Sequence, residues 1–231
     1  MLNYIKYYKT FLRYGLGYKG DACLANNYIS AFKDKGFYID VGCYHPIKHS
    51  LTHKLHKMGW SGINIDISRE SIDLFNTFRS KDKNLNLGIS TKTGYQDAFF
   101  EKKISTISSL KPDYSEKFLN NKKKFVRKIK TLTIHDLFKN NEITEVDFLK
   151  IDCEGLDTSI IKTINFEKYK INFLSVEFLD PYADFINKKN NDIKSVHELF
   201  FSSEMYNVLK KNFELLDHDQ FAFLLVNKKI Y

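Results

Sequence analysis

Short apolar runs recur along the chain, and segments with helical spacing separate them. The runs are Phe37–Val41, Ile63–Ile67, Leu85–Ile89, Phe148–Ile151 and Phe173–Phe178. Because they lack the polar alternation of a strand with one wet face, we predict strands covered on both faces. Strands that alternate with helices predict an α/β fold with a mostly parallel sheet.

Three crossover segments carry apolar residues at helical spacing, which predicts helices packed on the sheet. These stripes are Ile47, Leu51, Leu55 and Met58 between the first two strands, Ile72, Leu74, Phe75 and Phe78 after the second, and Leu156, Ile160, Ile161 and Ile164 after the fourth. Each crossover is long enough for a right-handed βαβ connection, so the pattern predicts a doubly wound sheet.

The two ends of the chain differ from this alternation. Phe213–Asp217 and Phe221–Val226 flank a short polar turn and predict an antiparallel hairpin that closes the sheet. Residues 1–35 predict a helical N-terminal cap, with a membrane-surface helix as the alternative. We therefore predict one domain over residues 36–231, with an irregular insertion at about 91–135 over the rim of the site.

Composition indicates a globular chain. Hydrophobic residues make up 43% of the 231 positions, which excludes a wholly disordered protein. No apolar run approaches the roughly 20 residues of a membrane-spanning helix. Since Lys6, Lys9 and Arg13 interrupt the N-terminal segment where a secretory signal would be apolar, we expect a cytoplasmic protein.

The net charge and the cysteines leave the function open. Lys and Arg total 36 against 28 Asp and Glu, and this excess of +8 could attract nucleic acid, anionic lipid or a phosphorylated small substrate. Cys23, Cys43 and Cys153 have no CxxC spacing, so we expect reduced thiols in buried positions.

Two carboxylates end the first two predicted strands. Asp40 precedes Gly42 in a strand-turn-helix pattern, where ligands of doubly wound sheets bind and a glycine lets the backbone approach them. Asp66 ends the second strand, where an acidic side chain can take the ribose hydroxyls of an adenosine cofactor. The alternative for Asp66 is an N-cap of the helix that starts near Ser68.

Three sequence blocks resemble the FkbM family of methyltransferases. They are Gly36–Gly42, Gly59–Asp66 and Asp147–Gly155, in the order and spacing of that family. With smaller similarities at Thr131–Leu132 and Val176–Phe178, the resemblance covers roughly residues 18–226. It implies a class I, Rossmann-like methyltransferase sheet, and the predicted hairpin favours that sheet over a plain dinucleotide-binding one.

The resemblance also implies S-adenosylmethionine as cofactor, with Asp40 and Gly42 near its methionine part and Asp66 on its ribose. Tyr44, His45 and Pro46 stand where many class I methyltransferases carry further glycines. The positions that we expect around the cofactor are Asp40, Gly42, Cys43, Tyr44, Asp66, Ile67 and Ser90.

Carboxylates after the fourth and fifth strands are candidates for catalysis. Methyl transfer to a hydroxyl requires a base as the oxygen attacks, and His45, Asp152 or Glu177 could serve. Asp152, Glu154 and Glu177 could instead hold Mg²⁺ or Mn²⁺, which prefer oxygen ligands. For Glu154 the alternative is a capping role at the following helix.

Two further patterns were weighed against this hypothesis. His49, His53 and His56 have zinc-ligand spacing, but they lie opposite the apolar stripe and are expected on the solvated face. Asp180-Pro181-Tyr182 is similar to a motif of nucleic-acid base methyltransferases. A nicotinamide-dependent oxidoreductase is a further alternative, which the missing G-x-G-x-x-G disfavours.

The acceptor that we expect is a small carbohydrate, methylated on a hydroxyl. The basic run from Lys111 to Lys130 is by default a solvated face, but it could hold a nucleotide-linked or otherwise anionic sugar. The family resemblance suggests surface-polysaccharide or secondary-metabolite assembly, such as a capsule precursor. We expect neither a nucleic-acid partner nor a transmembrane segment, and a homodimer is the hypothesis for the assembly.

Overall fold

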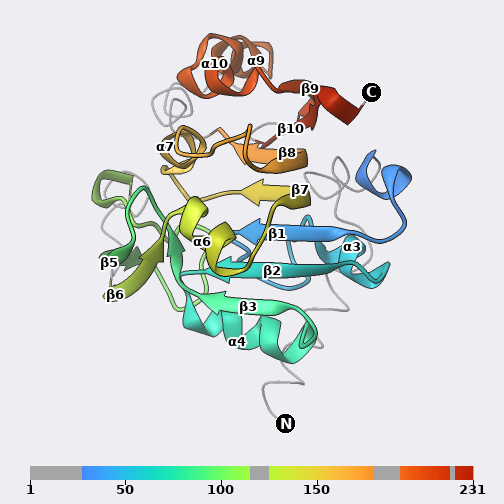
Figure 1. Ribbon diagram of the computed structural model, residues 1–231. Helices are drawn as coiled ribbons and strands as arrows, with labels where there is room; N and C mark the ends of the chain where they lie inside the picture. Colours follow the sequence, from blue (N-terminus) through green and yellow to red (C-terminus); the bar gives the residue numbers. More distant parts are fainter. Residues whose placement is uncertain (1–27, 115–124, 179–192, 219–221, 231) are drawn as a thin grey trace.

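A seven-stranded sheet forms the centre of the protein, in a computed structural model that describes residues 28–114, 125–178, 193–218 and 222–230 (Figure 1). The strand order is β3-β2-β1-β7-β8-β10-β9. In chain order these strands are β1 (Phe37–Val41), β2 (Ser61–Asp66), β3 (Lys83–Asn86), β7 (Glu145–Ile151), β8 (Lys170–Glu177), β9 (Phe213–His218) and β10 (Ala222–Asn227).

The sheet is parallel from β3 to β8, and β10 is antiparallel to both of its neighbours. This arrangement confirms the predicted mostly parallel sheet and the C-terminal hairpin. β1 has the predicted bounds, and the strands that begin earlier than predicted, such as β7, extend over half-polar ends. The fold is therefore α/β, as the sequence pattern indicates.

Helices cover both faces of the sheet. The helices are α3 (His53–Lys57), α4 (Arg69–Phe78), α6 (Ile134–Asn140), α7 (Asp157–Ile161), α9 (Ile193–Ser202), α10 (Glu204–Leu209) and the 3₁₀ turn η1 (Lys228–Ile230). The larger core joins alternate strand residues such as Ile39 and Leu149 to α6, α7 and α10. Tyr38 and Phe148 point to the opposite face, where they pack with Leu55 of α3.

The structure corrects two predicted elements. The helix expected across Ile47–Met58 is limited to the five residues of α3, and turns occupy the segment before it. The strand expected at Leu85–Ile89 breaks at Leu87, so that β3 ends in the central sheet and β4 (Gly88–Ile89) begins a second one. In both places the apolar residues are buried or partly buried, and apolar spacing alone does not fix the backbone.

A second sheet of three strands, in the order β4-β6-β5, lies beside the carboxyl ends of the parallel strands (Figure 1). β5 (Gly94–Phe100) and β6 (Phe125–Leu132) pair antiparallel over their full length. The stretch 91–135, expected to be irregular, therefore contains regular strands. Alternation of buried and exposed residues in β5 is the local pattern that fits this sheet.

Arg79 is buried below the loop that follows β1, at 1% exposure. Its guanidinium donates to Thr52 Oγ1 at 2.7 Å, to Ser50 Oγ at 2.8 Å and to the Pro46 carbonyl. A buried guanidinium needs such partners because an unpaired one would lose its hydration without compensation. Arg79 therefore fixes the turns that replace the expected helix.

No helix among the residues that the structure describes is long and apolar enough to span a membrane. Of the predicted N-terminal cap, residues 28–32 are helical, and Ile29 packs in the core beside Tyr38. The rest of that prediction, including Cys23, lies outside the described residues.

We expect Arg79→Ala to lower the free energy of unfolding by about 3–5 kcal/mol, because it removes one partner of a buried polar network and leaves the others unsatisfied. Chemical denaturation measures the change. Arg69→Ala, at an exposed position of the same helix α4, should change the free energy by less than about 0.5 kcal/mol. Similar losses in both variants would contradict a structural role for Arg79.

Candidate functional site

The strand order reverses its direction between β1 and β7, and the site lies at the carboxyl ends of these two strands. Gly42 follows β1 in a left-handed conformation, with φ of +73°. A Cβ at this position would lie 1.8 Å from the Asp152 carbonyl oxygen, so only glycine fits. The backbone can therefore line the crevice directly.

A pocket of about 210 Å³ opens at this edge of the sheet. Since a water molecule takes about 30 Å³ in the liquid, the pocket has room for a small organic molecule. Its apolar wall comes from Val41, Leu51, Ile65, Ile67, Leu87, Gly88, Ile89, Leu110 and Leu156. Its polar residues include Tyr44, His49, Asp66, Ser105, Thr106, Ser108, Lys150, Asp152, Glu154 and Glu177.

Asp66 ends β2 and faces the pocket. Its Oδ2 accepts the Tyr44 N–H at 2.8 Å, and its Oδ1 accepts the Ser68 N–H at 2.7 Å. Ser68 is itself the N-cap of α4, so the capping alternative for Asp66 is wrong. Burial raises the pKa of the Asp66 carboxyl to about 6, although both N–H groups oppose this shift. Each oxygen keeps a lone pair with which it can accept a ligand hydroxyl.

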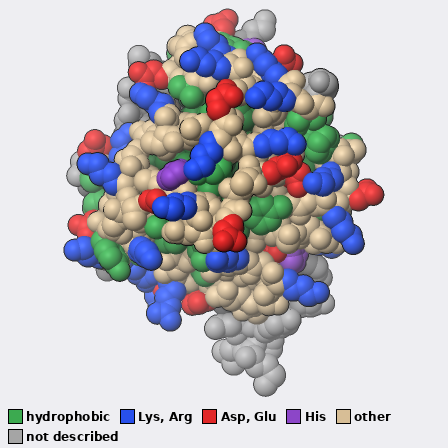
Figure 2. Space-filling model, viewed as in Figure 1, with side chains coloured by type: hydrophobic (Ala, Val, Ile, Leu, Met, Phe, Trp, Pro, Cys, Tyr) green, Lys and Arg blue, Asp and Glu red, His purple; other side chains and the backbone are tan. Residues whose placement is uncertain are grey.

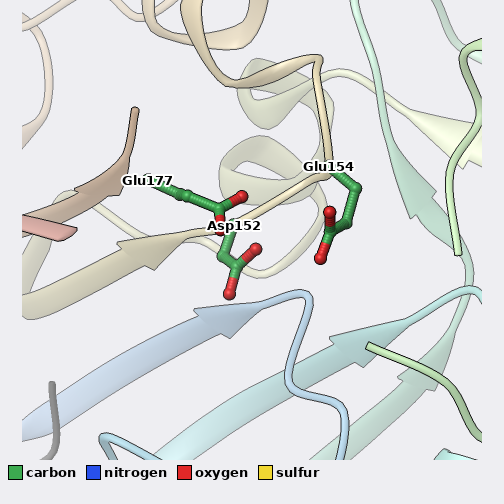
Figure 3. Close-up of side chains that lie close together, drawn as sticks. All are labelled: Asp152, Glu154 and Glu177. Carbon is green, nitrogen blue, oxygen red and sulfur yellow. The ribbon is translucent and has the colours of Figure 1, made fainter. Parts of the chain in front are cut away.

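Asp152, Glu154 and Glu177 lie together, as the sequence predicts for the ends of β7 and β8 (Figure 3). One carboxylate oxygen of each lies within 4.8 Å of the others. Among the described His, Cys, Asp and Glu residues, these three lie close enough together to hold a metal ion between them. The arrangement provides oxygen ligands from the loop after β7 and from the last residue of β8.

The carboxylates of this trio oppose one another's ionisation. Burial raises the pKa of Glu177 well above its usual value, and the charges of Asp152 and Glu154 add to the shift. Burial and Asp152 raise the pKa of Glu154 in the same direction. Oε2 of Glu177 is buried and has no hydrogen-bond partner among the described residues. The trio therefore favours a bound proton or cation.

The loop between β7 and α7 is strained and tightly held. Glu154 has φ of +51° and Gly155 has φ of +99°, and a left-handed conformation is unfavourable for a residue with a side chain. The Asp157 carboxylate compensates by accepting the Cys153 N–H at 2.8 Å and the Gly155 N–H at 3.2 Å. Burial raises the pKa of Asp157 to about 7.

Glu154 is also attached to the second sheet. Its carboxylate accepts the Tyr114 hydroxyl, and its carbonyl accepts the Ser109 hydroxyl at 2.7 Å. The N-cap of α7 is Leu156 and no side chain forms a capping hydrogen bond there, so Glu154 does not cap α7 through a hydrogen bond. These contacts connect the rim segment around Ser109 to the acidic loop.

Lys150 lies in the floor of the pocket, next to the last residue of β7. Its ammonium donates to the Gly42 carbonyl at 2.8 Å and pairs with Asp152 Oδ2 at 3.1 Å and Asp40 Oδ1 at 3.4 Å. Burial alone would lower the pKa of Lys150, but the two carboxylates raise it above its usual value. The lysine is therefore a fixed cation at the centre of the site.

The structure brings together part of the predicted cofactor set. Gly42, Tyr44, Asp66 and Ile67 line the pocket. Residues of that set that do not line it are Asp40, Cys43 and Ser90.

These three side chains have other partners. Asp40 Oδ2 accepts the Thr52 hydroxyl at 2.7 Å on the face of the sheet that carries α3. Cys43 packs on α4, and burial raises the pKa of its thiol, which makes it inert. Ser90 accepts a hydrogen bond from Gln96 Nε2 at 2.9 Å.

His45 was a candidate base, but its ring is buried outside the pocket lining. Nδ1 accepts the backbone N–H groups of Ile47 and Lys48 at 3.1 and 3.0 Å. Burial, followed by the charges of Lys48 and Arg79, lowers the pKa of His45 to about 4. A neutral ring that already accepts two hydrogen bonds holds the loop in place and has no free acceptor for a substrate proton at Nδ1.

Several pocket residues were not predicted from the sequence. Lys150 carried a signal, because a lysine within the apolar run Phe148–Ile151 must find partners when it is buried. Ser105, Ser108 and Leu110 reach the pocket from the segment between β5 and β6. No local pattern marks them, since the pairing of a second sheet brings them to the site.

The predicted histidine cluster is not a candidate metal site, because the described residues that could hold a metal ion together are the acidic trio. His49 is exposed as predicted, whereas His53 and His56 are half-buried, against the prediction of a solvated face. Burial lowers the pKa of His53 to about 4. His56 Nδ1 lies 3.4 Å from Asp82 Oδ2. This ring therefore faces the protein and not the solvent.

Lys and Arg side chains are spread over the face of the protein in Figure 2, with Asp and Glu between them. In β6, Arg127 pairs with Glu70 through two hydrogen bonds of 2.7 and 2.8 Å. This mixture does not form the single-sign stripe expected of a nucleic-acid surface. The motif Asp180-Pro181-Tyr182 and residues Lys122–Lys124 lie outside the described residues.

A comparison with protein families finds a match to the methyltransferase FkbM domain over residues 40–214, which is well over half of the chain. The match includes both loops of the pocket and confirms the resemblance that the sequence blocks indicated. No curated protein matches the chain.

The buried His45 predicts a loss of stability in acid. Its pKa of about 4 in the folded protein lies below the ordinary 6.5, so neutral His45 contributes stability above about pH 6.5 that disappears as pH falls toward 4. We expect His45→Asn, which keeps an acceptor oxygen and does not titrate, to reduce this loss by about 2–3 kcal/mol in chemical denaturation from pH 7 to 4.

His49→Asn is the control, because His49 is exposed and its replacement should alter the pH dependence much less. Equal slopes for His45→Asn and the wild-type protein would contradict the role of the neutral ring.

Proposed function

Because the chain belongs to the FkbM methyltransferase family, we propose that it transfers a methyl group from S-adenosylmethionine to a hydroxyl of a sugar. The observation that supports this most directly is the pocket at the carboxyl ends of β1, β2 and β7, with Asp66 on one side and an acidic trio on the other. The two ends of the pocket suit two different ligands, a nucleoside and an acceptor.

The strand order supports a class I, Rossmann-like methyltransferase fold. Strands β3-β2-β1-β7-β8 follow the doubly wound order, and the antiparallel β10 and β9 complete the sheet in the way that the sequence favoured over a dinucleotide-binding one. A nicotinamide-dependent oxidoreductase has no comparable support.

The residues present fit S-adenosylmethionine. Ile67, Leu87 and Leu110 give the pocket an apolar wall, and a Cβ at Gly88 would meet Leu110 Cδ1 at 2.8 Å, so glycine lets Leu110 pack closely against the backbone there. Asp66 offers its carboxylate to the ribose hydroxyls. The turn at Gly42 lets the backbone approach the methionine part of the ligand.

When bound, S-adenosylmethionine would supply the electrophilic methyl group. The protein aligns the acceptor oxygen for in-line attack and takes its proton. We propose Asp152 as that base, with Glu177 as the alternative, because both face the pocket beside Gly42 and His45 does not. Lys150 pairs with Oδ2 of Asp152, at 3.1 Å.

A carbohydrate acceptor fits the polar rim of Ser105, Thr106 and Ser108, whose hydroxyls can exchange hydrogen bonds with a sugar. A nucleotide-linked or otherwise anionic sugar, as in a capsule precursor, is the class that we propose. The cytoplasmic location and the homodimer stay predictions.

We propose in addition that Mg²⁺ or Mn²⁺ binds between Asp152, Glu154 and Glu177. Hard divalent cations prefer carboxylate oxygens, and the buried, unpartnered Oε2 of Glu177 supports a ligand in this place. Such an ion would lower the pKa of an acceptor hydroxyl. Asp152, Glu154 and Glu177 would then be metal ligands, and Asp152 would be both a ligand and the base.

S-adenosylmethionine is expected to bind in a calorimetric titration, and NAD is not. Asp66→Asn should weaken the binding of S-adenosylmethionine by about 10- to 100-fold, because a hydrogen bond to a charged group contributes about 1.5–3 kcal/mol. This substitution keeps one acceptor oxygen for the backbone N–H groups that Asp66 holds.

Asp73→Asn, an exposed substitution on α4, is the matched control and should leave the affinity unchanged within about twofold, as expected of an independent surface site. Unchanged affinity in Asp66→Asn would refute the ribose role. Tighter binding of NAD than of S-adenosylmethionine would refute the methyltransferase pocket. Transfer of labelled methyl groups to a panel of nucleotide-activated sugars then tests the acceptor.

The metal proposal predicts that Mn²⁺ binds to the purified protein and that Glu177→Gln abolishes this binding, because the amide removes one anionic ligand. Calorimetry or electron paramagnetic resonance measures the bound ion. Glu167→Gln, at an exposed side chain of the same type, should bind Mn²⁺ as the wild-type protein does. Full methyl transfer after removal of all metal by a chelator would exclude the ion.

A further inference from the structure

Lys150 occupies a position where a strand covered on both faces normally has an apolar residue. It is 7% exposed, and six successive residues of β7 are buried. A lysine in such a place loses its hydration, which is unfavourable unless anions and acceptors replace the water. The residue therefore needs an explanation beyond packing.

The sheet register determines what Lys150 contacts. Asp40 of β1 is its direct partner across the two parallel strands, so both side chains point to the same face. Asp152 follows two positions after Lys150, and alternation along the chain places it on that face too. Two carboxylates from neighbouring strand ends are thereby brought to one ammonium group.

The ammonium group of Lys150 is surrounded by oxygens of the protein itself. An ammonium group has three N–H donors. Its three oxygen neighbours are the Gly42 carbonyl at 2.8 Å, Asp152 Oδ2 at 3.1 Å and Asp40 Oδ1 at 3.4 Å. Although Lys150 lines the pocket, two carboxylates already balance its charge, so it is poorly suited to bind the acceptor or the cofactor directly.

We propose that Lys150 is a positioning residue, which fixes the Asp152 carboxylate against the Gly42 turn so that the acceptor loop and the cofactor loop keep one geometry. This inference rests on the proposed methyl transfer, in which Asp152 faces the acceptor. Asp40 supports this role, because its negative charge holds the ammonium between the two loops. The Thr52 hydroxyl, which donates to Asp40, fixes the Asp40 carboxylate in turn.

The connection to Gly42 makes the role specific. Asp152 N–H donates to the Val41 carbonyl at 3.2 Å, and Lys150 donates to the carbonyl of the next residue, Gly42. The backbone and the side chain thus tie the same two loops together. Without the ammonium, Asp152 and Asp40 would be like charges on one face, and repulsion would turn the half-buried Asp152 toward solvent.

The test is a kinetic comparison of Lys150→Met with the wild-type protein, using S-adenosylmethionine and the sugar that the acceptor panel identifies. We expect kcat to fall at least about 100-fold, the effect of a small misplacement of a reacting group. The KM for S-adenosylmethionine should change by less than about threefold, since its ribose ligand Asp66 is untouched. Equal losses of affinity and kcat would contradict the proposal.

Lys150→Met leaves Asp40 buried without its cation and could unfold the protein, so Asp40→Asn/Lys150→Met is the second variant. It removes both buried charges and is expected to fold and to show the same loss of kcat. Lys162→Met, at a half-exposed lysine, is the control and should keep the wild-type kcat. Wild-type kcat in the folded double variant would overturn the proposal.

A crystal structure of the double variant gives a readout that does not depend on methyl transfer. We expect the Asp152 carboxylate to leave its position beside Gly42. An unchanged Asp152 side chain would overturn the positioning role even if the wild-type protein transferred no methyl group. Failure of S-adenosylmethionine to bind the wild-type protein would refute the proposed function and leave this structural comparison intact.

Discussion

The close approach of two loops at the ends of β1 and β7 is the constraint on which the site depends. The Gly42 backbone lies against the Asp152 carbonyl with no space for a Cβ, and the Asp152 N–H bonds to Val41. The chain leads from β1 to β2 on one side and from β7 to β8 on the other. The loops after β1 and β7 therefore diverge and leave a crevice between them. The pocket follows from this reversal, and the side chains decide what it can bind.

Buried charges hold that approach in place. Arg79, Thr52, Asp40, Lys150 and Asp152 form a continuous series of contacts from below the loop after β1 to the pocket. The Thr52 hydroxyl links the Arg79 guanidinium to the Asp40 carboxylate, and Lys150 pairs with both Asp40 and Asp152, so each buried charge has a polar or oppositely charged partner. Such a series specifies one arrangement of the loops, because a shift of any member would leave a buried charge unpaired.

The strands of the fold could be predicted from the sequence better than its helices and loops. The run Phe37–Val41 is fully apolar apart from Asp40 and gave the bounds of β1, whereas the apolar spacing across Ile47–Met58 predicted a helix that the structure replaces with turns. Those turns depend on Arg79 and on the acceptor ring of His45, which are distant contacts or side-chain bonds. The spacing of apolar residues along the chain does not reveal the contacts of Arg79 or of His45.

The candidate site shows the same division. Asp66 and the trio at the ends of β7 and β8 could be predicted because parallel strands end at one edge. The sequence could not show that the Asp40 side chain lies outside the pocket. Its direction depends on Lys150, its partner across the strand pair, and on Thr52 from the following loop. Ser105, Ser108 and Leu110 arrive through the second sheet, whose pairing joins residues far apart in sequence.

The second sheet also affects the electrostatics of the site. Tyr114 and Ser109 hold Glu154 in its left-handed conformation, so the rim segment brings the third carboxylate toward Asp152 and Glu177. Lys150 neutralises one charge of that trio, and its remaining contacts are already taken by Gly42 and Asp40. The negative charge that is left favours the binding of a proton or of a cation from solution. In the proposed reaction the acceptor hydroxyl would approach the same oxygens, so the position of the rim would affect the charge that the acceptor meets.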